Sequence, residues 1–484
     1  MRRRDFLTGM GAGFGAVTAG YVPMARASCG GLATPYRVLE INLRGGMSAF
    51  DTVLWSERYY DPNRTTTPGV GQIAEDVLQQ EINEPGVMGA VPIGGATQYL
   101  WASTDALGPL TTNPLFNDRW RVVCMGHDFT PHEVAVPYTL TGTTQGREYH
   151  AGMGAWVKDC PVAGSPVEPS YIFYAQTTTS TAQIAASVTG LGGTASPVLV
   201  PWNGGSADTA LFMRDPQTRD GVVQALQGVY EERLQYHAGV RSSAYQTYES
   251  ARHTLEDAED NVKNGIANAL TTGANQLEAS VRTAIRMLKS GDARYICVVD
   301  SATSGGSPFD THGHADYTLH THFWPYETHG DKHRRMLAEA LAGLAELSGS
   351  DLDNIMVIVT TEFGRYKMDH KRDINGDPLR DNNGNLVAPP SSNSEHWPAG
   401  YAQLVIGGEV GIGAPSSIET RLAGHIDDLG YARKSVGGAP GYTPAEFRAA
   451  MLYAAGIDVT GGLDELDLGP YASASNLYDS IVKN

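Results

Sequence analysis

The feature that most constrains the fold is a series of short apolar runs separated by polar and helical segments. Such runs cover residues 36–43, 120–125, 295–300, 355–360 and 402–406. Apolar runs of this length predict buried strands. Because segments with apolar residues at three- and four-residue steps alternate with them, we expect a mainly parallel α/β sheet flanked by helices.

Helices are expected at 134–140, 332–347 and 443–455, together with a long helical insertion at about 219–290. In the insertion, apolar residues recur mostly at three- and four-residue steps, the spacing that places them on one helix face. Shorter strands are expected at 171–174 and 197–200. No internal repeat divides the chain, so residues 28–484 are predicted to form a single α/β domain.

The N-terminus reads as a twin-arginine signal peptide spanning residues 1–27. Arg3 and Arg4 precede Asp5-Phe-Leu, a weakly hydrophobic Gly/Ala stretch follows, and Ala25-Arg-Ala27 fits a cleavage site. The alternatives are a buried N-terminal helix or a lipid anchor at Cys29. No apolar run long enough for a membrane-spanning helix follows the signal. We therefore expect export to the periplasm or the cell exterior, without an integral membrane segment.

The net charge is −18 at pH 7, and the presumed signal removes four arginines and one aspartate, so the mature chain is more acidic still. This acidity argues against nucleic acid or anionic lipid as a partner. Among the four cysteines, Cys124 and Cys297 lie in strand-like runs and are expected to be buried. A disulfide between Cys29 and Cys160 fits an oxidising compartment, but the sequence leaves the pairing open.

Acidic and histidine residues border the last three apolar runs. Asp310 and His312 follow the first, Glu362 directly follows the second, and His396 precedes the third. Ligands of open α/β sheets gather outside the carboxyl ends of the strands, so these side chains are expected to converge on one divalent metal ion: zinc, calcium, manganese or iron. His314 is a further candidate ligand. The alternative is a polar surface loop with incidental histidines.

The order of these motifs resembles the alkaline phosphatase/sulfatase superfamily, and within it a family of twin-arginine-exported bacterial proteins known as a domain of unknown function. The resemblance spans roughly residues 36–460. The matching segments, in chain order, are Gly45-Gly46-x-Ser48, Thr139-Leu-Thr-Gly142, Asp310-Thr-His312, Glu362-Phe-Gly-Arg365 and Glu395-His396. It implies the fold of that superfamily and a metal held by the acids and histidines of the last three segments.

Two departures from the superfamily pattern concern the metal and the nucleophile. Ser48 stands where the resemblance implies a metal-binding aspartate, and Asp51 is the nearest acid. Counting nine residues back from Thr141 to the expected nucleophile lands on His132. A histidine serves either as a nucleophile or as a metal ligand. Thr130 and Ser48 are alternative nucleophiles.

Arg365 or Arg44 is a candidate for neutralising charge on a transferred group. The alternative for Arg365 is a structural ion pair with Glu362. The leading hypothesis is an exported metal-dependent hydrolase acting on phosphate or sulfate esters, in small molecules or an extracellular polymer. The alternative is a non-catalytic binding or assembly protein with a degraded or structural metal site and a protein partner. No flavin or nicotinamide fingerprint favours a redox protein.

Overall fold

The computed structural model describes the parts of the chain that form the sheet, its flanking helices and several connecting loops. The described residues are 30–47, 49–54, 89–92, 99–102, 104–116, 119–143, 152–160, 170–174, 198–201, 266, 268–273, 275–299, 336–367, 382–383, 394–410, 421–426, 431–435, 438–459 and 473–483.

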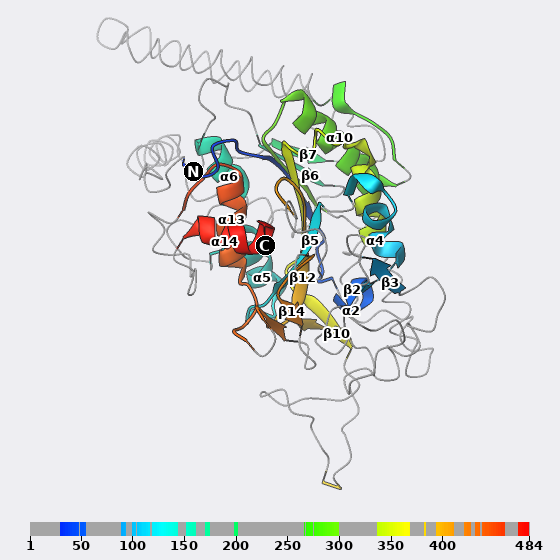
Figure 1. Ribbon diagram of the computed structural model, residues 1–484, viewed down its shortest axis with the longest axis vertical. Helices are drawn as coiled ribbons and strands as arrows, with labels where there is room; N and C mark the ends of the chain where they lie inside the picture. Colours follow the sequence, from blue (N-terminus) through cyan, green and yellow to red (C-terminus); the bar gives the residue numbers. More distant parts are fainter. Residues whose placement is uncertain are drawn as a thin grey trace, which may run out of the picture.

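An eight-stranded sheet with the order β13-β5-β12-β9-β1-β8-β6-β7 forms the centre (Figure 1). Its strands are β1 (Arg37–Asn42), β5 (Trp120–Met125), β6 (Ser170–Tyr174), β7 (Val198–Pro201), β8 (Tyr295–Val299), β9 (Ile355–Thr360), β12 (Tyr401–Gly407) and β13 (Leu422–Ala423). All neighbouring pairs are parallel except the two that involve β12. The predicted mainly parallel sheet is confirmed.

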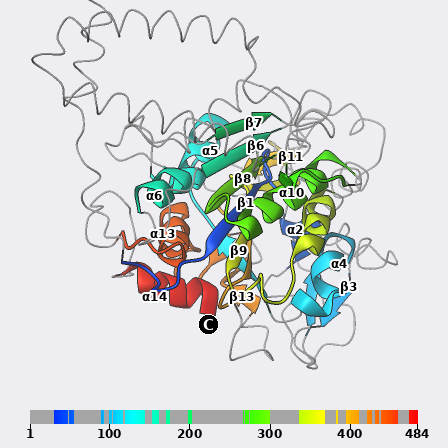
Figure 2. The ribbon, with the colours of Figure 1, turned by 90° about the horizontal axis from the view of Figure 1, so that it is seen from above.

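The central strands are buried on both faces, which explains why they read as continuous apolar runs. Successive side chains of β1 enter two separate cores: Leu39 and Ile41 belong to one, Val38 to the other. The α4 helix (Thr104–Thr111) and α10 (Gln276–Ser290) cover the first face. On the opposite face lie α5 (His132–Thr141), α6 (Met153–Asp159), α13 (Pro444–Ala454) and α14 (Ala474–Tyr478), as Figure 2 shows.

The helix ends follow local sequence signals. Asn275 caps α10 by accepting a hydrogen bond from the Glu278 amide, and Gly291 ends the helix in the left-handed region at φ 89°. Thr443 and Glu446 form a capping box at α13, with a proline in its first turn. A further helix covers residues 336–342 and passes into a 3-10 turn, η4 (Gly343–Glu346).

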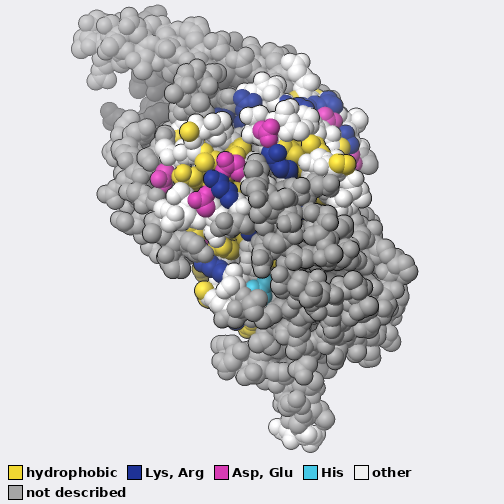
Figure 3. Space-filling view, in the orientation of Figure 1, with side chains coloured by type: hydrophobic (Ala, Val, Ile, Leu, Met, Phe, Trp, Pro, Cys, Tyr) yellow, Lys and Arg dark blue, Asp and Glu magenta, His cyan; other side chains and the backbone are white. Residues whose placement is uncertain are grey.

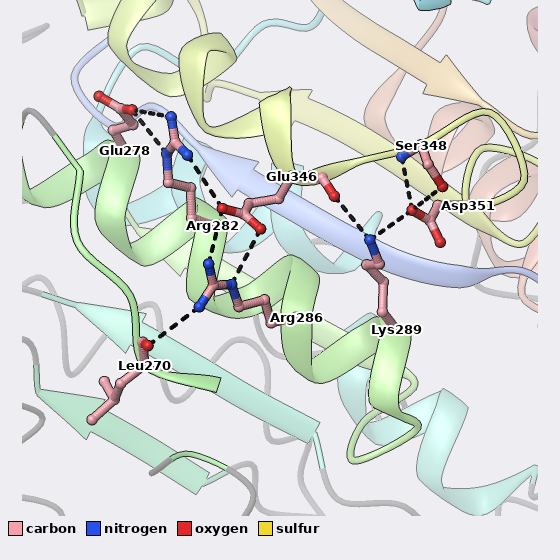
Figure 4. A network of polar contacts seen from close by, with 8 residues as sticks. All are labelled: Leu270, Glu278, Arg282, Arg286, Lys289, Glu346, Ser348 and Asp351. Atoms are coloured by element: carbon pink, nitrogen blue, oxygen red, sulfur yellow. Dashed lines mark hydrogen bonds and ion pairs between the residues drawn. The ribbon is translucent and has the colours of Figure 1, made fainter. Parts of the chain in front are cut away.

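The outer surface of α10 is tied to η4 and the loop that leads into β9 (Figure 4). Glu346 receives hydrogen bonds from Arg282 and Arg286, and Lys289 forms an ion pair with Asp351 at 2.9 Å. Figure 3 shows that side chains of both charge signs intermingle on the visible part of the described surface. These surface pairs fix the entry of the chain into β9, the strand that precedes Glu362.

Within the described residues, three small sheets lie outside the main one. They consist of β10 (Gly364–Lys367) with β11 (Ser394–Trp397), of β14 (His425–Ile426) with β15 (Ala432–Arg433), and of β2 (Val53–Leu54), β3 (Gly89–Pro92) and β4 (Tyr99–Ala102). The short helix α2 (Ala49–Thr52) precedes β2. The β10–β11 pair matters for the site, because it places residues that follow β9 beside residues that precede β12.

The structure describes three of the four cysteines, and the predicted burial of two of them is confirmed. Cys124 and Cys297 are buried and free, and Cys160 is disulfide-bonded. The predicted partner Cys29, the signal segment 1–27, most of the helical insertion and residues 301–335 lie outside the described residues. Among the helices that the structure does describe, none is long and apolar enough to cross a membrane.

Candidate functional site

The candidate site lies at the carboxyl edge of the parallel strands, where three loops meet. The loops follow β1 at Leu43–Met47, β5 at Gly126–Pro131 and β9 at Thr361–Phe363. Since β12 is antiparallel, its amino end reaches the same edge: Tyr401 pairs with Met125, the last residue of β5. The short strand β11 just before β12 therefore delivers His396 to this edge.

Glu362 is the buried centre of the site, with its side chain 1% exposed. Its Oε1 lies 2.8 Å from His132 Nδ1, and the Gly45 amide donates to the same oxygen at 2.8 Å. Burial alone would raise the pKa of Glu362, but the hydrogen bond and charge of His132, with the main-chain donors, hold that pKa below its ordinary value. Glu362 is therefore an ionised carboxylate paired with an imidazole.

The hydrogen bonds of two histidines define where their protons lie. The Glu362 carboxylate only accepts, so His132 donates through Nδ1–H, and a neutral ring would carry its lone pair on Nε2. His396 Nδ1 lies 2.6 Å from the Thr130 carbonyl oxygen, which assigns the same tautomer. The two ring centroids are 4.4 Å apart, and Phe363 stacks on His396 at 4.1 Å. The site thus holds two adjacent imidazoles whose Nδ1 atoms are anchored to oxygen.

A third histidine, His127, is hydrogen-bonded to the backbone of the site. Its Nε2 lies 2.6 Å from the Glu362 carbonyl oxygen, and its Nδ1 accepts from the Phe129 amide. Burial lowers the pKa of His127 to about 4, so the ring is neutral at physiological pH. Sequence reasoning did not select His127 as a site residue, although its place directly after β5 is the signal that would have found it.

The glycine turn after β1 holds the other side of Glu362. Gly45 and Gly46 have φ values of 112° and 89°, in the region that only glycine enters readily. This conformation lets the Gly45 amide point at the Glu362 carboxylate, while the Met47 amide donates to Thr361 Oγ1 at 3.1 Å. The backbone after β1 and the side chains after β9 are thereby fixed to each other.

A second buried carboxylate lies behind the site, inside the core. Glu40 of β1 is fully buried and forms a two-pronged ion pair with Arg448 of α13. Tyr295 and Thr360 also donate to Glu40, at 2.7 and 2.8 Å. Arg448 Nε donates to the Thr139 carbonyl oxygen at 2.6 Å, so the same guanidinium holds α5, the helix that begins at His132.

The structure brings together four of the predicted site residues: His132, Glu362, His396 and Thr130. Arg365 pairs with His396 across β10 and β11, and Asp51 lies in α2, but the side chains of Arg365 and Asp51 are outside the described part. The remaining candidates, Ser48, Asp310, His312 and His314, also lie outside it. Within the described ranges, no group of three or more His, Cys, Asp or Glu residues is arranged to hold a metal.

The chemistry of the described donors nevertheless suits a metal ligand at one position in particular. A metal-binding imidazole usually donates its second nitrogen to an oxygen acceptor, which fixes the tautomer and the ring orientation. His396 meets this condition through the Thr130 carbonyl and is partly exposed. Glu362 Oε1, by contrast, already accepts from His132 and Gly45. His396 is therefore the described residue whose hydrogen bonding best matches that of a metal ligand, whereas Oε1 of Glu362 is engaged by His132 and Gly45.

The fold and the site define the class of protein. It is an α/β protein with a mainly parallel sheet and a cluster of carboxylate and histidine side chains at the carboxyl edge of that sheet. The chain belongs to the family described as Protein of unknown function (DUF1501), which matches residues 36–466. The family membership predicted from the motif order is thereby confirmed. No curated protein sequence matches the chain.

Several solved structures with alkaline phosphatase/sulfatase-like folds are similar to the chain. One is the alkaline phosphatase from the Antarctic bacterium TAB5, with 11% identity, a TM-score of 0.31, and coverage of 78% of this chain and 93% of that one. Another is the lipoteichoic acid synthase LtaP from Listeria monocytogenes, with 9% identity, a TM-score of 0.37, and coverage of 92% and 78%. The C-terminal periplasmic domain of EcEptC from Escherichia coli, in complex with Zn, has 10% identity, a TM-score of 0.32, and coverage of 91% and 89%.

Proposed function

We propose that this protein is an exported metal-dependent hydrolase that acts on phosphate or sulfate esters at the carboxyl edge of the sheet. The observation that carries the proposal is the pair of adjacent imidazoles, His132 and His396, whose Nδ1 atoms are held by Glu362 and by the Thr130 carbonyl. With Nδ1 held in this way, Nε2 is the ring atom left to each histidine for binding a metal or attacking an electrophile. The twin-arginine signal supports export to the periplasm or beyond.

Asp310, His312 and His396 are the residues that would hold the metal, with His314 and Asp51 as further candidates. Asp310 and His312 follow β8 in the sequence, and the carboxyl end of β8 lies at the same edge of the sheet as the carboxyl end of β1. A bound divalent ion supplies polarisation of a phosphoryl or sulfuryl oxygen and lowers the pKa of bound water. Within the protein, Glu362 orients His132, and Phe363 covers the two imidazoles with an apolar ring.

The substrate is proposed to be a small ester or an ester group on an extracellular polymer, since the acidic chain would repel nucleic acid. One observation favours a second candidate, a binding or assembly protein on the same fold. Oε1 of Glu362, a predicted metal ligand, accepts hydrogen bonds from His132 and Gly45, as the oxygen of a purely structural carboxylate would. In that case a protein partner takes the place of a substrate.

Metal analysis and ester hydrolysis on the same samples test the proposal. The purified chain is incubated with zinc, calcium, manganese or iron, desalted, and assayed with nitrophenyl phosphate and nitrophenyl sulfate. We expect stoichiometric metal and turnover in the wild type, with both lost in His396→Ala. Glu133→Gln is the matched control, because Glu133 is exposed and adjacent to His132. Bound metal without turnover of either ester would favour the binding protein, and a folded chain that takes up no metal would refute the proposed function.

A further inference from the structure

We propose that Cys29 and Cys160 form a disulfide bond that locks the N-terminal segment of the exported chain to the end of α6, and that this bond leaves Cys29 unavailable for a lipid anchor. Cys160 is disulfide-bonded, and Cys29 lies outside the described residues. Two observations carry the pairing: the cysteines of the chain, and the contacts of the segment that follows Cys29. The bond is independent of the proposed hydrolase function.

The cysteines of the chain leave one partner for Cys160. The sequence holds four cysteines, of which Cys124 and Cys297 are free. Both lie in central strands and have no exposed surface, and burial raises the pKa of the Cys297 thiol well above its ordinary value. Because the thiolate is the reactive form, buried thiols of this kind are inert in disulfide exchange. Cys29 is therefore the cysteine of the chain that pairs with Cys160.

The segment that follows Cys29 is bound to the carboxyl end of α13. The Gly31 amide donates to the Gly456 carbonyl oxygen at 3.1 Å, and the Tyr36 amide donates to the Ala454 carbonyl oxygen at 3.0 Å. A Cβ at Gly31 would come within 2.6 Å of the Gly456 backbone, so a residue without a side chain is required at this close approach. The chain is thus held against α13 two residues after Cys29.

Arg294 brings the end of α6 to the same place. Its buried guanidinium donates to the Cys160 carbonyl oxygen at 2.6 Å and to the Ala455 carbonyl oxygen at 2.9 Å. Ala455 directly precedes the residue that holds the Gly31 amide. Two residues of extended chain span about 7 Å, so Cys29 is able to reach Cys160 from Gly31. These non-covalent contacts bring the two cysteines together before any bond forms between them.

Formation of the bond removes two electrons and two protons from the two thiols. The co-reactant is the disulfide of an exported thiol oxidoreductase, which takes up those electrons and protons and becomes a dithiol. Gly30 is exposed, so the Cys29 thiolate attacks first and gives a mixed disulfide, from which the Cys160 thiolate displaces the reduced oxidoreductase. Because cytosolic thiols are kept reduced, the bond forms after export. A sulfur held in this bond carries no thioether-linked lipid.

Thiol alkylation and peptide mapping test the pairing. The full-length precursor from the cytosol and the exported chain are denatured without reductant and treated with N-ethylmaleimide. We expect all four cysteines of the precursor to be labelled, but only Cys124 and Cys297 in the exported chain. Trypsin digestion of the exported chain without reductant should yield the peptides 28–37 and 159–214 joined by a disulfide. In Cys29→Ser, Cys160 should be labelled as well.

Hydrogen exchange tests whether the bond locks the N-terminal segment. In Cys29→Ser, the amides of residues 31–36 should exchange about tenfold faster or more, because their hydrogen bonds to α13 open without a covalent restraint. The thermal midpoint should fall by about 5 °C, since the bond closes the long loop from Cys29 to Cys160. Thr34→Ser, at an exposed residue of the same segment, is the matched control and should change neither value.

Four labelled cysteines in the exported chain, or Cys160 joined to a different cysteine or to a second copy of the chain, would refute the pairing. A lipid on the peptide 28–37 would show that Cys29 anchors the chain instead. A disulfide already present in the precursor would refute formation after export, and unchanged exchange at residues 31–36 in Cys29→Ser would refute the lock. If Cys29→Ser proves unstable, the reduced wild-type chain supplies the same comparison. None of these measurements uses ester turnover, so their failure is distinct from that of the proposed function.

Discussion

Replacing Arg448 with methionine isolates the contribution of the buried ion pair behind the site. The substitution keeps much of the side-chain volume but removes the cation from Glu40, a carboxylate with no exposed surface. Glu40 retains the hydrogen bonds from Tyr295 and Thr360. The Thr139 carbonyl oxygen loses the donor that Arg448 Nε supplies at 2.6 Å.

The expected loss of folding free energy follows from how the Glu40 carboxyl responds to the loss of Arg448. Without its cation, the buried Glu40 carboxyl takes up a proton. Protonation costs about 1.4 kcal/mol for each pH unit above the solution pKa near 4.3, or about 4 kcal/mol at pH 7. The lost Thr139 contact adds about 1 kcal/mol. Breaking a buried ion pair from one side typically costs about 3–5 kcal/mol, in the same range. We expect Arg448→Met to lower the free energy of unfolding by about 4–5 kcal/mol at pH 7.

The pH dependence of this loss has a definite sign. In the wild type, burial raises the pKa of Glu40, but the charge and hydrogen bonds of Arg448 outweigh it and hold the pKa below its ordinary value. Its stabilising contribution is therefore present above the unfolded pKa and is lost as the pH falls through the folded pKa. In Arg448→Met the folded pKa is raised, so stability is greatest below the unfolded pKa and declines as the pH rises. The difference between the two proteins should shrink from pH 7 to about pH 4.5.

Urea unfolding followed by tryptophan fluorescence at several pH values measures the effect. The double variant Glu40→Gln/Arg448→Met should regain about 2–3 kcal/mol over Arg448→Met at pH 7, because no buried charge is left unpaired. Arg286→Met, at a side chain 41% exposed, is the matched control and should cost at most about 1 kcal/mol. A loss below about 1 kcal/mol in Arg448→Met, or a loss independent of pH, would refute the reasoning.

Two further predictions concern other parts of the fold. Gly407→Ala should cost about 1–3 kcal/mol by thermal unfolding, because φ is 83° and a Cβ would come within 2.5 Å of the Ile355 carbonyl oxygen; a neutral effect would contradict the assigned turn. Glu346→Gln should lose about 1 kcal/mol near pH 7. Hydrogen bonds from Arg286 lower the pKa of Glu346, so the deficit should disappear as the pH falls through that lowered pKa; a deficit unchanged in acid would show that charge is not its cause.

The strands were the most predictable part of the fold. The runs at 120–125 and 355–360 form β5 and β9 with the predicted bounds, because Gly126-His127 follows the first, Thr361-Glu362 follows the second, and both strands are buried. The antiparallel direction of β12 was not predictable, since an apolar run reads alike in either direction. This direction nevertheless matters for the site. His396 precedes β12 and Glu362 follows β9, and because the two strands are antiparallel, both residues lie at the same edge of the sheet.

The partners within the site were harder to predict than its members. Counting from Thr141 selected His132, and strand position selected Glu362, but nothing in the sequence shows that the two side chains meet across 230 residues. The buried pair of Glu40 and Arg448 joins residues 408 positions apart. Such contacts depend on how strands and helices are ordered in space, which local patterns do not encode.

The two buried carboxylates Glu40, within β1, and Glu362, in the loop after the neighbouring strand β9, have partners of different chemistry. Glu40 is paired with Arg448, which is 1% exposed and cannot lose its proton near neutral pH. Glu362 is paired with His132, which is 18% exposed and can change its proton and its bonding partners. Arg448 also holds the Thr139 carbonyl of α5, so the permanent ion pair fixes the helix whose first residue is His132. Altering the first pair should therefore cost mainly stability, whereas altering the second should change mainly the proton and the hydrogen-bond partners of His132 at the site.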